Sequence, residues 1–398
     1  MRSPAPSRDG VRERRPTDVI RNRQPPKAGS SQLLILALAA LLMACAAAFA
    51  SSGPATAARP QPDTGQCATG VDLFGFSDAL NKRTFDGTNV GGLSGLTYDA
   101  GRDVYYGLVD NEGTTPARFY TLRLPTDGQK LGKPRILDVT TLKDGSGQPI
   151  TGANFDGEGI ALTPDDELLI SSETEPSIRR FALDGTFLGE LPVPDRFLVQ
   201  GGGGQPNQTF ESLSLSPDGQ SLFTANEGYL SADGETAGGG DRIRILRYEN
   251  DPQNGFVPAE EFYYLADPGL GVVEILALSE DELLVLERGF QAGVGNTIKI
   301  YRVSLEGATD VSGVDSLAAS SVAPVQKELL VDLADCPPGG AKTAPGAVQP
   351  NPLLDNFEAL TLGPVLPDGR RSLVLVSDDN FNSCQTTRVV VLGVVTDY

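Results

Sequence analysis

Four glutamates recur at one place in a short repeated pattern, and carboxylates that recur in this way can gather around a cation. In four of the five copies a glutamate begins an apolar run, a turn rich in Pro, Asp or Gly follows, and a second apolar run ends in polar or charged side chains. The four are Glu158, Glu211, Glu274 and Glu358. The copy that comes first in the chain has Ser94 at this place. Because hard cations such as Ca²⁺ take oxygen ligands, this recurring position is the first candidate for a functional site.

The hairpin that begins at Glu158 adds a second carboxylate. Its turn, 164–167, separates two apolar runs, and pairing around this turn places Leu162 opposite Leu169 and Glu158 opposite Glu173. Like charges that face each other across two strands destabilise a sheet. We therefore expect either a bound group or full solvation at this end of the hairpin.

Every copy also carries polar side chains at the end of its second run and a basic residue near the start of its third. The second runs end in Asp110 to Glu112, in Glu173, in Asn226 and Glu227, in Glu287 and Arg288, and in Asp378 to Asn380. The basic residues are Arg118, Arg179, Arg242, Lys299 and Arg388. Oxygen ligands beside guanidinium groups suit a cation together with an anionic substrate such as a phosphate ester.

These side chains need a scaffold that brings equivalent positions together, and a β-propeller does so. Short apolar runs between Gly, Pro and Asp turns indicate strands, and 46 glycines and 29 prolines fit a turn-rich all-β chain. The copies occupy 91–142, 155–194, 210–267, 272–333 and 356–396. Such recurrence is typical of a propeller with one four-stranded blade per copy. We expect five blades; six is the alternative if a degenerate copy lies in an insert.

The last copy offers only three strands, whereas residues 71–80 form a lone strand pattern before the first copy. We expect this N-terminal strand to pair beside 387–395 and to close the ring, which removes an open sheet edge. In a propeller the first strand of each blade lines the channel, and its start lies on the same face as the end of the second strand. The recurring acids should therefore surround one mouth of the channel.

This geometry predicts one site at the mouth. The expected metal ligands are Glu158, Glu173, Glu211, Glu274, Glu287, Glu358 and Asp378, and the expected metal is Ca²⁺. The candidates for a catalytic base are Glu158, Glu211 and Glu358. The candidates for contacts with an anionic substrate are Arg118, Arg179, Arg242 and Arg388. The alternative is structural: the glutamates cap strand starts and pair with the arginines.

Composition excludes several classes of function. The chain has no histidine, so a Ser-His-Asp triad, a Cys-His pair and His-ligated zinc are all excluded. The first 50 residues hold eight of the 32 Lys and Arg and three of the 52 Asp and Glu, so the remainder carries a formal charge of about −25. Nucleic-acid binding needs a basic face, and we expect no such partner. We expect a monomer that acts on a small anionic ester.

The N-terminus has the pattern of an export segment. A basic region precedes the uncharged apolar run 33–50, and small residues follow it. This order is typical of a secretory signal. We expect an export signal or signal anchor in 1–58, a linker in 59–66 and the propeller domain in 67–398. The protein is then periplasmic or extracellular, and it touches a membrane only through its N-terminal segment. The alternatives are a retained anchor at 33–50 and lipidation of Cys45.

Three cysteines remain beyond the export segment, and an odd number leaves one unpaired. Cys384 lies just past the second strand of the last copy, and Cys336 lies in the loop that enters that copy. Both belong near the same mouth. We therefore predict a Cys336–Cys384 disulfide, with Cys67 unpaired.

Three stretches resemble the repeats of a known family: DGEGIALTPDDELLISSE, FESLSLSPDGQSLFTANEG and NFEALTLGPVLPDGRRSLVLVSDDNF. They look like those of the bacterial phytase-like family, described as having esterase-like activity of phytase. The resemblance covers about 70–398. It implies an exported β-propeller, distantly similar to calcium-dependent propeller phytases, which bind Ca²⁺ and phosphate at the channel mouth and need no catalytic histidine.

Two hypotheses of function follow. The first is a Ca²⁺-dependent phosphoesterase or carboxylesterase that acts on an anionic ester at the mouth. The second is a non-catalytic propeller that binds a ligand or a protein at its rim, since a fold does not fix a function.

Overall fold

The computed structural model describes residues 65–110 and 113–395. The expected export segment at 1–58, its apolar run 33–50, Cys45 and nearly all of the linker 59–66 lie outside the described residues. Within the described part of the chain, no helix is long and apolar enough to cross a membrane. The described residues all belong to one compact unit.

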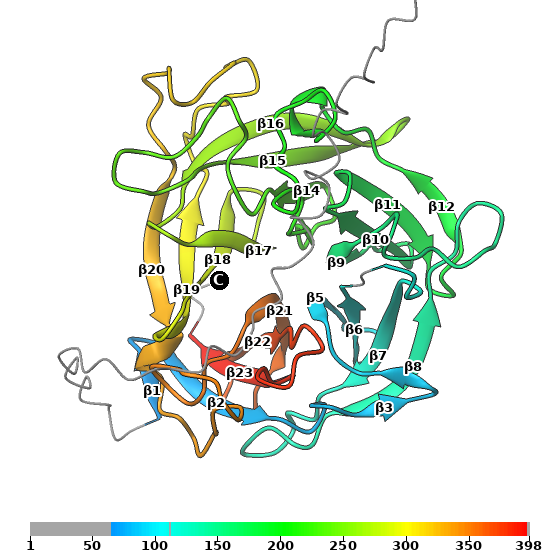
Figure 1. Ribbon diagram of the computed structural model, residues 1–398, viewed down its shortest axis with the longest axis vertical. Helices are drawn as coiled ribbons and strands as arrows, with labels where there is room; N and C mark the ends of the chain where they lie inside the picture. The colour runs from blue at the N-terminus through cyan, green and yellow to red at the C-terminus, as the bar shows by residue number, and fades with distance from the viewer. Residues whose placement is uncertain (1–64, 111–112, 396–398) are drawn as a thin grey trace, which may run out of the picture. The chain divides into compact units, whose positions relative to one another are not determined.

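Five antiparallel sheets make up this unit and confirm the expected all-β propeller of five blades. Figure 1 shows them arranged in a ring, with β5, β9, β17 and β21 nearest the centre. The first blade contains β5 (Leu93–Asp99), β6 (Val104–Val109), β7 (Arg118–Arg123) and β8 (Arg135–Thr141). The second contains β9 (Gly157–Leu162), β10 (Glu167–Ser172), β11 (Ser177–Ala182) and β12 (Phe187–Glu190).

The third and fourth blades contain the longest strands, of ten or eleven residues. The third contains β13 (Ser214–Leu215), β14 (Ser221–Ala225), β15 (Arg242–Asp251) and β16 (Gly255–Leu265). The fourth contains β17 (Gly271–Ala277), β18 (Glu282–Gln291), β19 (Gly295–Ser304) and β20 (Gln326–Asp332). A small hairpin of β3 (Thr84–Phe85) and β4 (Thr88–Asn89) and two 3-10 turns, η1 (Asp195–Phe197) and η2 (Leu333–Asp335), complete the described elements outside the fifth blade.

The fifth blade joins the two ends of the chain, as expected from the sequence. Its strands β21 (Phe357–Val365), β22 (Arg371–Ser377) and β23 (Val389–Val394) come from the last copy, and β2 (Val71–Ser77) pairs with β23. One further strand, β1 (Gln66–Ala68), pairs outside β2, so this sheet has five strands. The closure confirms the expected role of the N-terminal strand.

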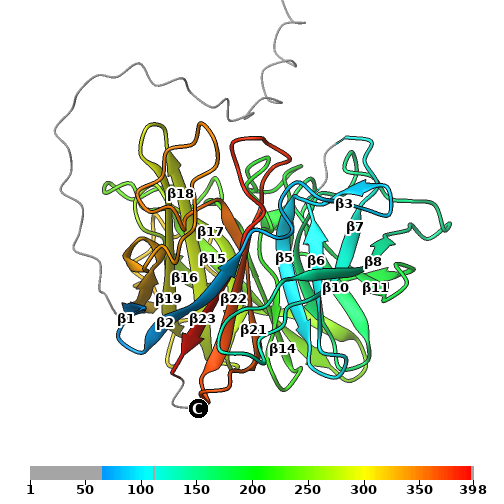
Figure 2. The ribbon, with the colours of Figure 1, turned by 90° about the horizontal axis from the view of Figure 1, so that it is seen from below.

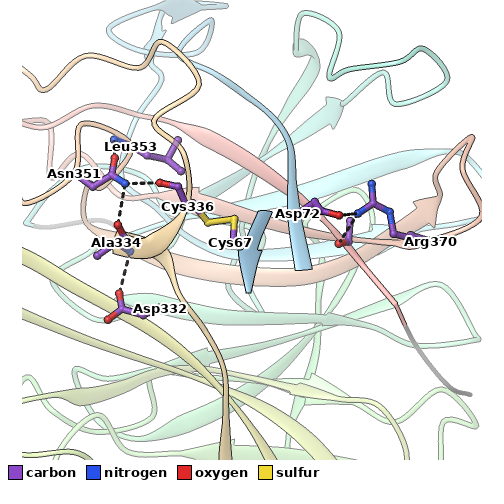
Figure 3. The surroundings of a disulfide bond; sticks show 9 residues. Cys67, Asp72, Asp332, Ala334, Cys336, Asn351, Leu353 and Arg370 are labelled. Carbon is purple, nitrogen blue, oxygen red and sulfur yellow. Dashed lines mark hydrogen bonds and ion pairs between the residues drawn. A yellow bond between two sulfur atoms is a disulfide. The ribbon is translucent and has the colours of Figure 1, made fainter. Parts of the chain in front are cut away.

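The disulfide differs from the prediction. Cys336 bonds to Cys67, not to Cys384, so Cys67 is not unpaired. Figure 3 shows the bond between β1 and the segment that follows β20, with Cys336 also held through its carbonyl by the Asn351 amide. Sequence spacing placed Cys336 near the mouth. The extra strand β1 instead brings Cys67 to within 4.0 Å of it, measured between Cα atoms.

The β9–β10 hairpin is also shifted by one residue from the predicted pairing. Leu162 faces Leu168, and Ala161 faces Leu169. The turn contains three residues because Asp166 adopts a left-handed backbone, with φ of 62°, and Thr163 pairs with Glu167. A tight turn followed by one left-handed residue is a common hairpin connection. The carbonyl of Asp156 accepts the amide N–H of Glu173, so Glu158 and Glu173 still meet at one end of the hairpin.

The core consists of apolar clusters between neighbouring blades. Leu108 and Phe119 of the first blade, for example, pack with Ile160, Leu168 and Phe181 of the second. Corresponding clusters join each blade to the next all around the ring. Burial of these faces fixes the register of every sheet, and it therefore fixes which side chains reach the channel mouth.

Candidate active site

Glycines allow the innermost strands of neighbouring blades to approach closely at the mouth. A Cβ on Gly95 of β5 would lie 2.3 Å from the carbonyl oxygen of Glu158, and one on Gly159 would lie 2.4 Å from the amide nitrogen of Leu213. Any side chain at either position would force these strands apart. Glu158 is therefore held between the first and third blades, near Glu211 at the entrance to β13.

Five carboxylates meet at this point. Glu158, Glu173 and Glu211 are buried, and one oxygen of each lies within 4.8 Å of the others. Asp110, Asp156 and Glu158 form a second group within the same distance. Glu158 belongs to both groups, so it joins them into one set, called the acidic cluster from here on. Its members come from the first three blades.

The fourth blade contributes an arginine to the edge of this cluster. The Nη2 of Arg288, in β18, lies 3.1 Å from Glu227 of the third blade and 3.3 Å from Glu358 of the fifth. Its Nη1 donates to the side-chain oxygen of Asn356 at 2.7 Å. The Nε of Arg288 is buried and has no partner among the described residues. This guanidinium therefore joins three blades and keeps one donor unused.

Glu358 is fixed through both of its oxygens. Ser94 donates to one at 3.3 Å, and the Asn356 amide donates to the other at 3.0 Å. Ser94 stands where the other copies have glutamate, so the one copy without the acid uses its hydroxyl to hold a neighbouring acid. Asp378, at the end of β22, is buried and accepts the amide N–H of Asn380 at 2.7 Å.

The electrostatics of the mouth favour protons or a cation. Burial, followed by the negative charge of neighbouring carboxylates, raises the pKa of Glu158 and Glu211 well above the ordinary value. The same two causes raise the pKa of Glu173 to about 8. Burial also raises the pKa of Glu358, although Arg288 opposes this shift. Without a cation, Glu173 holds a proton at neutral pH.

The buried side chain of Asn226 is a second feature that favours a bound group at the mouth. It is 1% exposed, and neither its amide nitrogen nor its amide oxygen has a partner among the described residues. It follows β14 and shares the strand face of Leu222, which packs with Leu169 of the second blade. Asn226 is therefore directed toward the blade that carries Glu173. A buried polar group without a partner costs free energy that a ligand can recover.

The donor set fits a hard cation. The acidic cluster offers carboxylate oxygens, and the amide oxygen of Asn226 adds a neutral one. Ca²⁺ takes six to eight oxygen ligands of these kinds. No nitrogen or sulfur donor belongs to either carboxylate group, which agrees with an oxygen-binding metal.

Four of the seven predicted ligands belong to neither carboxylate group, namely Glu274, Glu287, Glu358 and Asp378. Glu358 and Asp378 lie next to the cluster, whereas the carboxylates of Glu274 and Glu287 bind groups of the fold. Glu274 turns its carboxylate to backbone amides, accepting from Leu213 at 3.1 Å and Ile275 at 3.0 Å. Glu287 accepts from Tyr264 and Lys327, at 2.5 Å each. Neither belongs to the two carboxylate groups. The carboxylates of Glu274 and Glu287 therefore have the structural role that was the alternative to metal binding.

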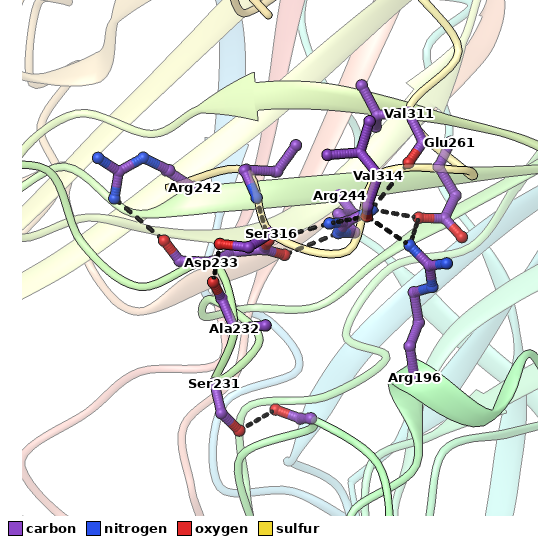
Figure 4. A network of polar contacts seen from close by, with 12 residues as sticks. Arg196, Ser231, Ala232, Asp233, Arg242, Arg244, Glu261, Val311, Val314 and Ser316 are labelled. Atoms are coloured by element: carbon purple, nitrogen blue, oxygen red, sulfur yellow. Dashed lines mark hydrogen bonds and ion pairs between the residues drawn. The ribbon is translucent and has the colours of Figure 1, made fainter. Parts of the chain in front are cut away.

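Three of the four predicted substrate arginines are held by the fold. Arg118 donates to the carbonyls of Pro116 and Asn89. Arg242 donates to three carbonyls of the loop 233–235, beside the buried network of Arg244, Asp233 and Glu261 that Figure 4 shows. The fully buried Arg388 binds Asp78 through two nitrogens, at 2.7 and 2.9 Å.

Arg179 has a different environment. Its guanidinium stacks 4.6 Å from the ring centre of Phe155 and lies 3.8 Å from Glu190. With Asn154 and Thr151 it lines a hollow beside the second blade. Within the described chain, no hydrogen bond or ion pair joins it to the acidic cluster, whereas Arg288 pairs with Glu227 and Glu358 at the edge of the cluster.

The prediction of site residues missed Asp110, Asp156, Asn226, Glu227 and Arg288. Four of them end the second run of a copy, where the sequence analysis noted polar side chains without choosing among them. Arg288 had the clearest signal, since it is the basic residue among otherwise acidic or amide ends. Asp156 precedes the repeated glutamate by two residues and has no counterpart that would have marked it.

Comparison with known proteins gives one match over most of the domain. The model of a family described as "Phytase-like: Esterase-like activity of phytase" matches residues 88–381. No curated protein matches the sequence.

Many solved structures match at low identity. A periplasmic gluconolactonase of Pseudomonas aeruginosa is 15% identical, covers 77% of this chain and 87% of its own, and gives a TM-score of 0.33. A family AA12 enzyme of Trichoderma reesei is 13% identical, covers 86% and 100%, and scores 0.40. A PQQ-bound aldose sugar dehydrogenase of Streptomyces coelicolor is 13% identical, covers 77% and 80%, and scores 0.32. Similarity at this level says nothing about activity.

Proposed function

The chain belongs to the phytase-like family, whose description is esterase-like activity of phytase, and on that premise we propose that it is an exported, metal-dependent ester hydrolase that works at the acidic cluster. The observation that carries the proposal is the convergence of Glu158, Glu173 and Glu211, buried and with oxygens within 4.8 Å of one another. So many carboxylates would repel one another unless a cation or protons compensate them. A rigid rim of five blades holds them there at a cost to stability, which is the pattern of a functional site.

The residues that would hold the metal are Asp110, Asp156, Glu158, Glu173 and Glu211, with Asn226 beside them. Calcium is the metal that this donor set favours. When bound, such an ion polarises the ester oxygen and lowers the pKa of a water molecule. The proposal does not extend to Glu274 and Glu287, whose carboxylates serve the fold.

The chain's own residues supply binding and proton transfer. Arg288 presents a buried Nε–H that has no partner among the described residues, and this group can donate to a negatively charged oxygen of the ester as charge develops there. Glu358 is held in place by Ser94 and Asn356 and lies beside Arg288, so it is the group we assign as general base. Burial and the charge of Glu358 raise the pKa of Asp378, and we assign this carboxyl as the group that gives a proton to the leaving group.

Export and the monomeric state are part of the proposal. The N-terminal pattern agrees with export, and a disulfide that joins Cys67 to Cys336 is typical of proteins outside the cytosol. We propose that the protein acts as a monomer in the periplasm or outside the cell.

A calcium-dependence screen tests the function. The purified protein is assayed with p-nitrophenyl acetate, p-nitrophenyl phosphate and phytate, with Ca²⁺ and with a chelator. We expect hydrolysis of at least one ester that requires the metal and is lost in Glu358→Gln, which keeps the size of the side chain but removes its basicity. The matched control is Glu274→Gln, at the equivalent position of the fourth blade. Absence of hydrolysis with all three esters would favour the non-catalytic binding hypothesis.

A further inference from the structure

Resting on the proposed function, we propose that Phe381 is an aromatic platform at the channel mouth, and that the substrate is an ester with a flat aromatic group next to the ester bond rather than a polyanion such as phytate. Phe381 lies in the loop that follows β22, and 47% of its surface is exposed. Figure 2 shows this loop, in red, on the same side of the propeller as the hairpin between β18 and β19. An exposed ring beside a buried polar site is available to a ligand.

The backbone holds this ring in a conformation that a phenylalanine rarely adopts. Asn380 and Phe381 have φ angles of 43° and 50°. A bulky residue with positive φ costs free energy and persists only where its surroundings impose it. Here Asp379 accepts the amide N–H groups of both Phe381 and Gly92, each at 3.1 Å, and Lys82 binds Asp379 from outside. The loop is therefore fixed rather than free to fold the ring inward.

The position of the ring connects it to the acidic cluster. A Cβ on Gly92 would lie 2.8 Å from Cε2 of Phe381 and 3.0 Å from the carbonyl oxygen of Asp110. The ring thus packs on Gly92, directly beside a member of the cluster. The guanidinium of Arg118 lies 6.0 Å from the ring centre. A substrate whose ester group reaches the cluster can lay an adjoining flat group against Phe381.

The charges around the mouth argue in the same direction. Eight carboxylates lie at or next to the cluster, namely Asp110, Asp156, Glu158, Glu173, Glu211, Glu227, Glu358 and Asp378. Arg288 pairs with two of them, Glu227 and Glu358, whereas Arg118, Arg242 and Arg388 donate to groups of the fold. A polyanion would meet more carboxylates than guanidinium groups here. A substrate of low charge must gain affinity elsewhere, and stacking on an aromatic ring provides it.

Substrate preference tests the platform. The ratio kcat/KM is measured for p-nitrophenyl acetate and for ethyl acetate, which share the acyl group and differ in the aromatic ring. Phe381→Ala should lower kcat/KM for the aryl ester about fivefold to tenfold, mainly through KM, and should leave the ethyl ester within about twofold. Phe381→Tyr should keep the wild-type preference. Phe381→Gly also removes the ring, and glycine adopts positive φ without strain. The same selective loss in this variant would therefore not come from backbone strain.

Phe290 supplies the matched control. It is also 47% exposed and lies in β18 of the fourth blade, so Phe290→Ala should leave both esters unchanged. Equal losses for the two esters in Phe381→Ala, or the same selective loss in Phe290→Ala, would overturn the proposal.

Binding of inert ligands separates this inference from the proposed function. Calorimetry with phenylphosphonate and methylphosphonate, which share the anionic group, needs no turnover. Phenylphosphonate should bind the wild type more tightly, and this advantage should vanish in Phe381→Ala. If the wild type hydrolyses no ester but shows this preference, the proposed function fails and the platform stands. Equal affinity for the two phosphonates, in a protein that does hydrolyse esters, would remove the platform and leave the function.

Discussion

The guanidinium of Arg288 lies 3.3 Å from the carboxylate of Glu358, and this contact joins the fourth blade of the propeller to the fifth. The same nitrogen lies 3.1 Å from Glu227, so the third blade takes part as well. Arg288 is buried among carboxyl groups, and burial alone would disfavour the ionised form of these groups. Its charge lowers the pKa of Glu173, Glu211 and Glu358, against burial and neighbouring carboxylates that raise it. The positive charge of Arg288 thus partly offsets the repulsion among these carboxylates.

Replacement of Arg288 should therefore destabilise the propeller. Arg288→Ala breaks a buried ion pair and leaves carboxylates without a partner, which costs about 3 kcal/mol. The free energy of unfolding is measured by urea denaturation. Arg288→Lys keeps the charge but not the forked geometry, so its loss should be smaller. Arg179→Ala, which removes an arginine outside the cluster, should change stability little; a similar loss there would mean that the effect is not specific to the mouth.

Strand order, blade number and ring closure could be predicted because they depend on local signals. Short apolar runs, turn residues and one recurring glutamate mark the blades, and propeller geometry then places Glu158 and Glu211 at one mouth. The predictions that were wrong concern the groups that individual side chains contact. The fourth blade reverses the expected roles, since Glu274 binds backbone amides while Arg288 enters the site. No repeat pattern shows which of two neighbouring polar side chains will turn inward.

The predictions of the disulfide and of the hairpin register were wrong for different reasons. Cys67 lies in β1, an extra strand outside β2 that the strand count did not require. The register of the second blade depends on a single residue, Asp166, which adopts a left-handed backbone. Asparagine, aspartate and glycine all tolerate that conformation, so composition alone does not decide where the turn ends.

The Cys67–Cys336 bond should contribute strongly to stability. The two residues are 269 positions apart in the sequence, and a long loop loses much conformational freedom when it is closed in the unfolded chain. Replacement of both cysteines by alanine should lower the free energy of unfolding by about 4 kcal/mol. Cys67→Ala alone should have nearly the same effect, because either change removes the bond. Urea denaturation measures the difference, and an unchanged midpoint in both variants would contradict it.

The N-terminal strand should be essential to the whole ring. Deletion of 67–85 removes β2, exposes the edge of β23 and cuts the bidentate ion pair between Asp78 and Arg388. We expect cooperative unfolding of the domain at a much lower temperature, not the loss of a peripheral tail. Calorimetry compares the truncated and full-length proteins. A truncated protein that melts like the full-length one would show that the fifth blade is stable with three strands.

Glu274 should make stability depend on pH. Burial raises its pKa in the folded protein well above the unfolded value of 4.5. Its contribution to stability is therefore fully present below pH 4.5 and declines as the pH rises toward the folded pKa, since the unfolded chain releases the proton first. In Glu274→Gln this decline disappears. The melting temperature of the variant relative to wild type should rise between pH 5 and pH 8. Glu280→Gln, on the exposed turn between β17 and β18, should show no such trend, and a flat difference for Glu274→Gln would refute the assignment.

Calcium should stabilise the folded protein through the acidic cluster. An ion that binds only the folded state adds about 2.7 kcal/mol at a hundredfold excess over its dissociation constant, so a chelator should lower the melting temperature by about 5 °C and added Ca²⁺ should restore it. Glu158 belongs to both carboxylate groups, and Glu158→Gln should abolish this response, because a neutral amide leaves the charge of the cation uncompensated. Its metal-free form should melt no lower than the metal-free wild type, since carboxylate repulsion is reduced. Glu274 has the equivalent position in the fourth blade but belongs to neither carboxylate group. The Glu274→Gln variant should therefore respond to Ca²⁺ like the wild type. A melting temperature that ignores both chelator and Ca²⁺ in the wild type would remove the metal from the proposed mechanism.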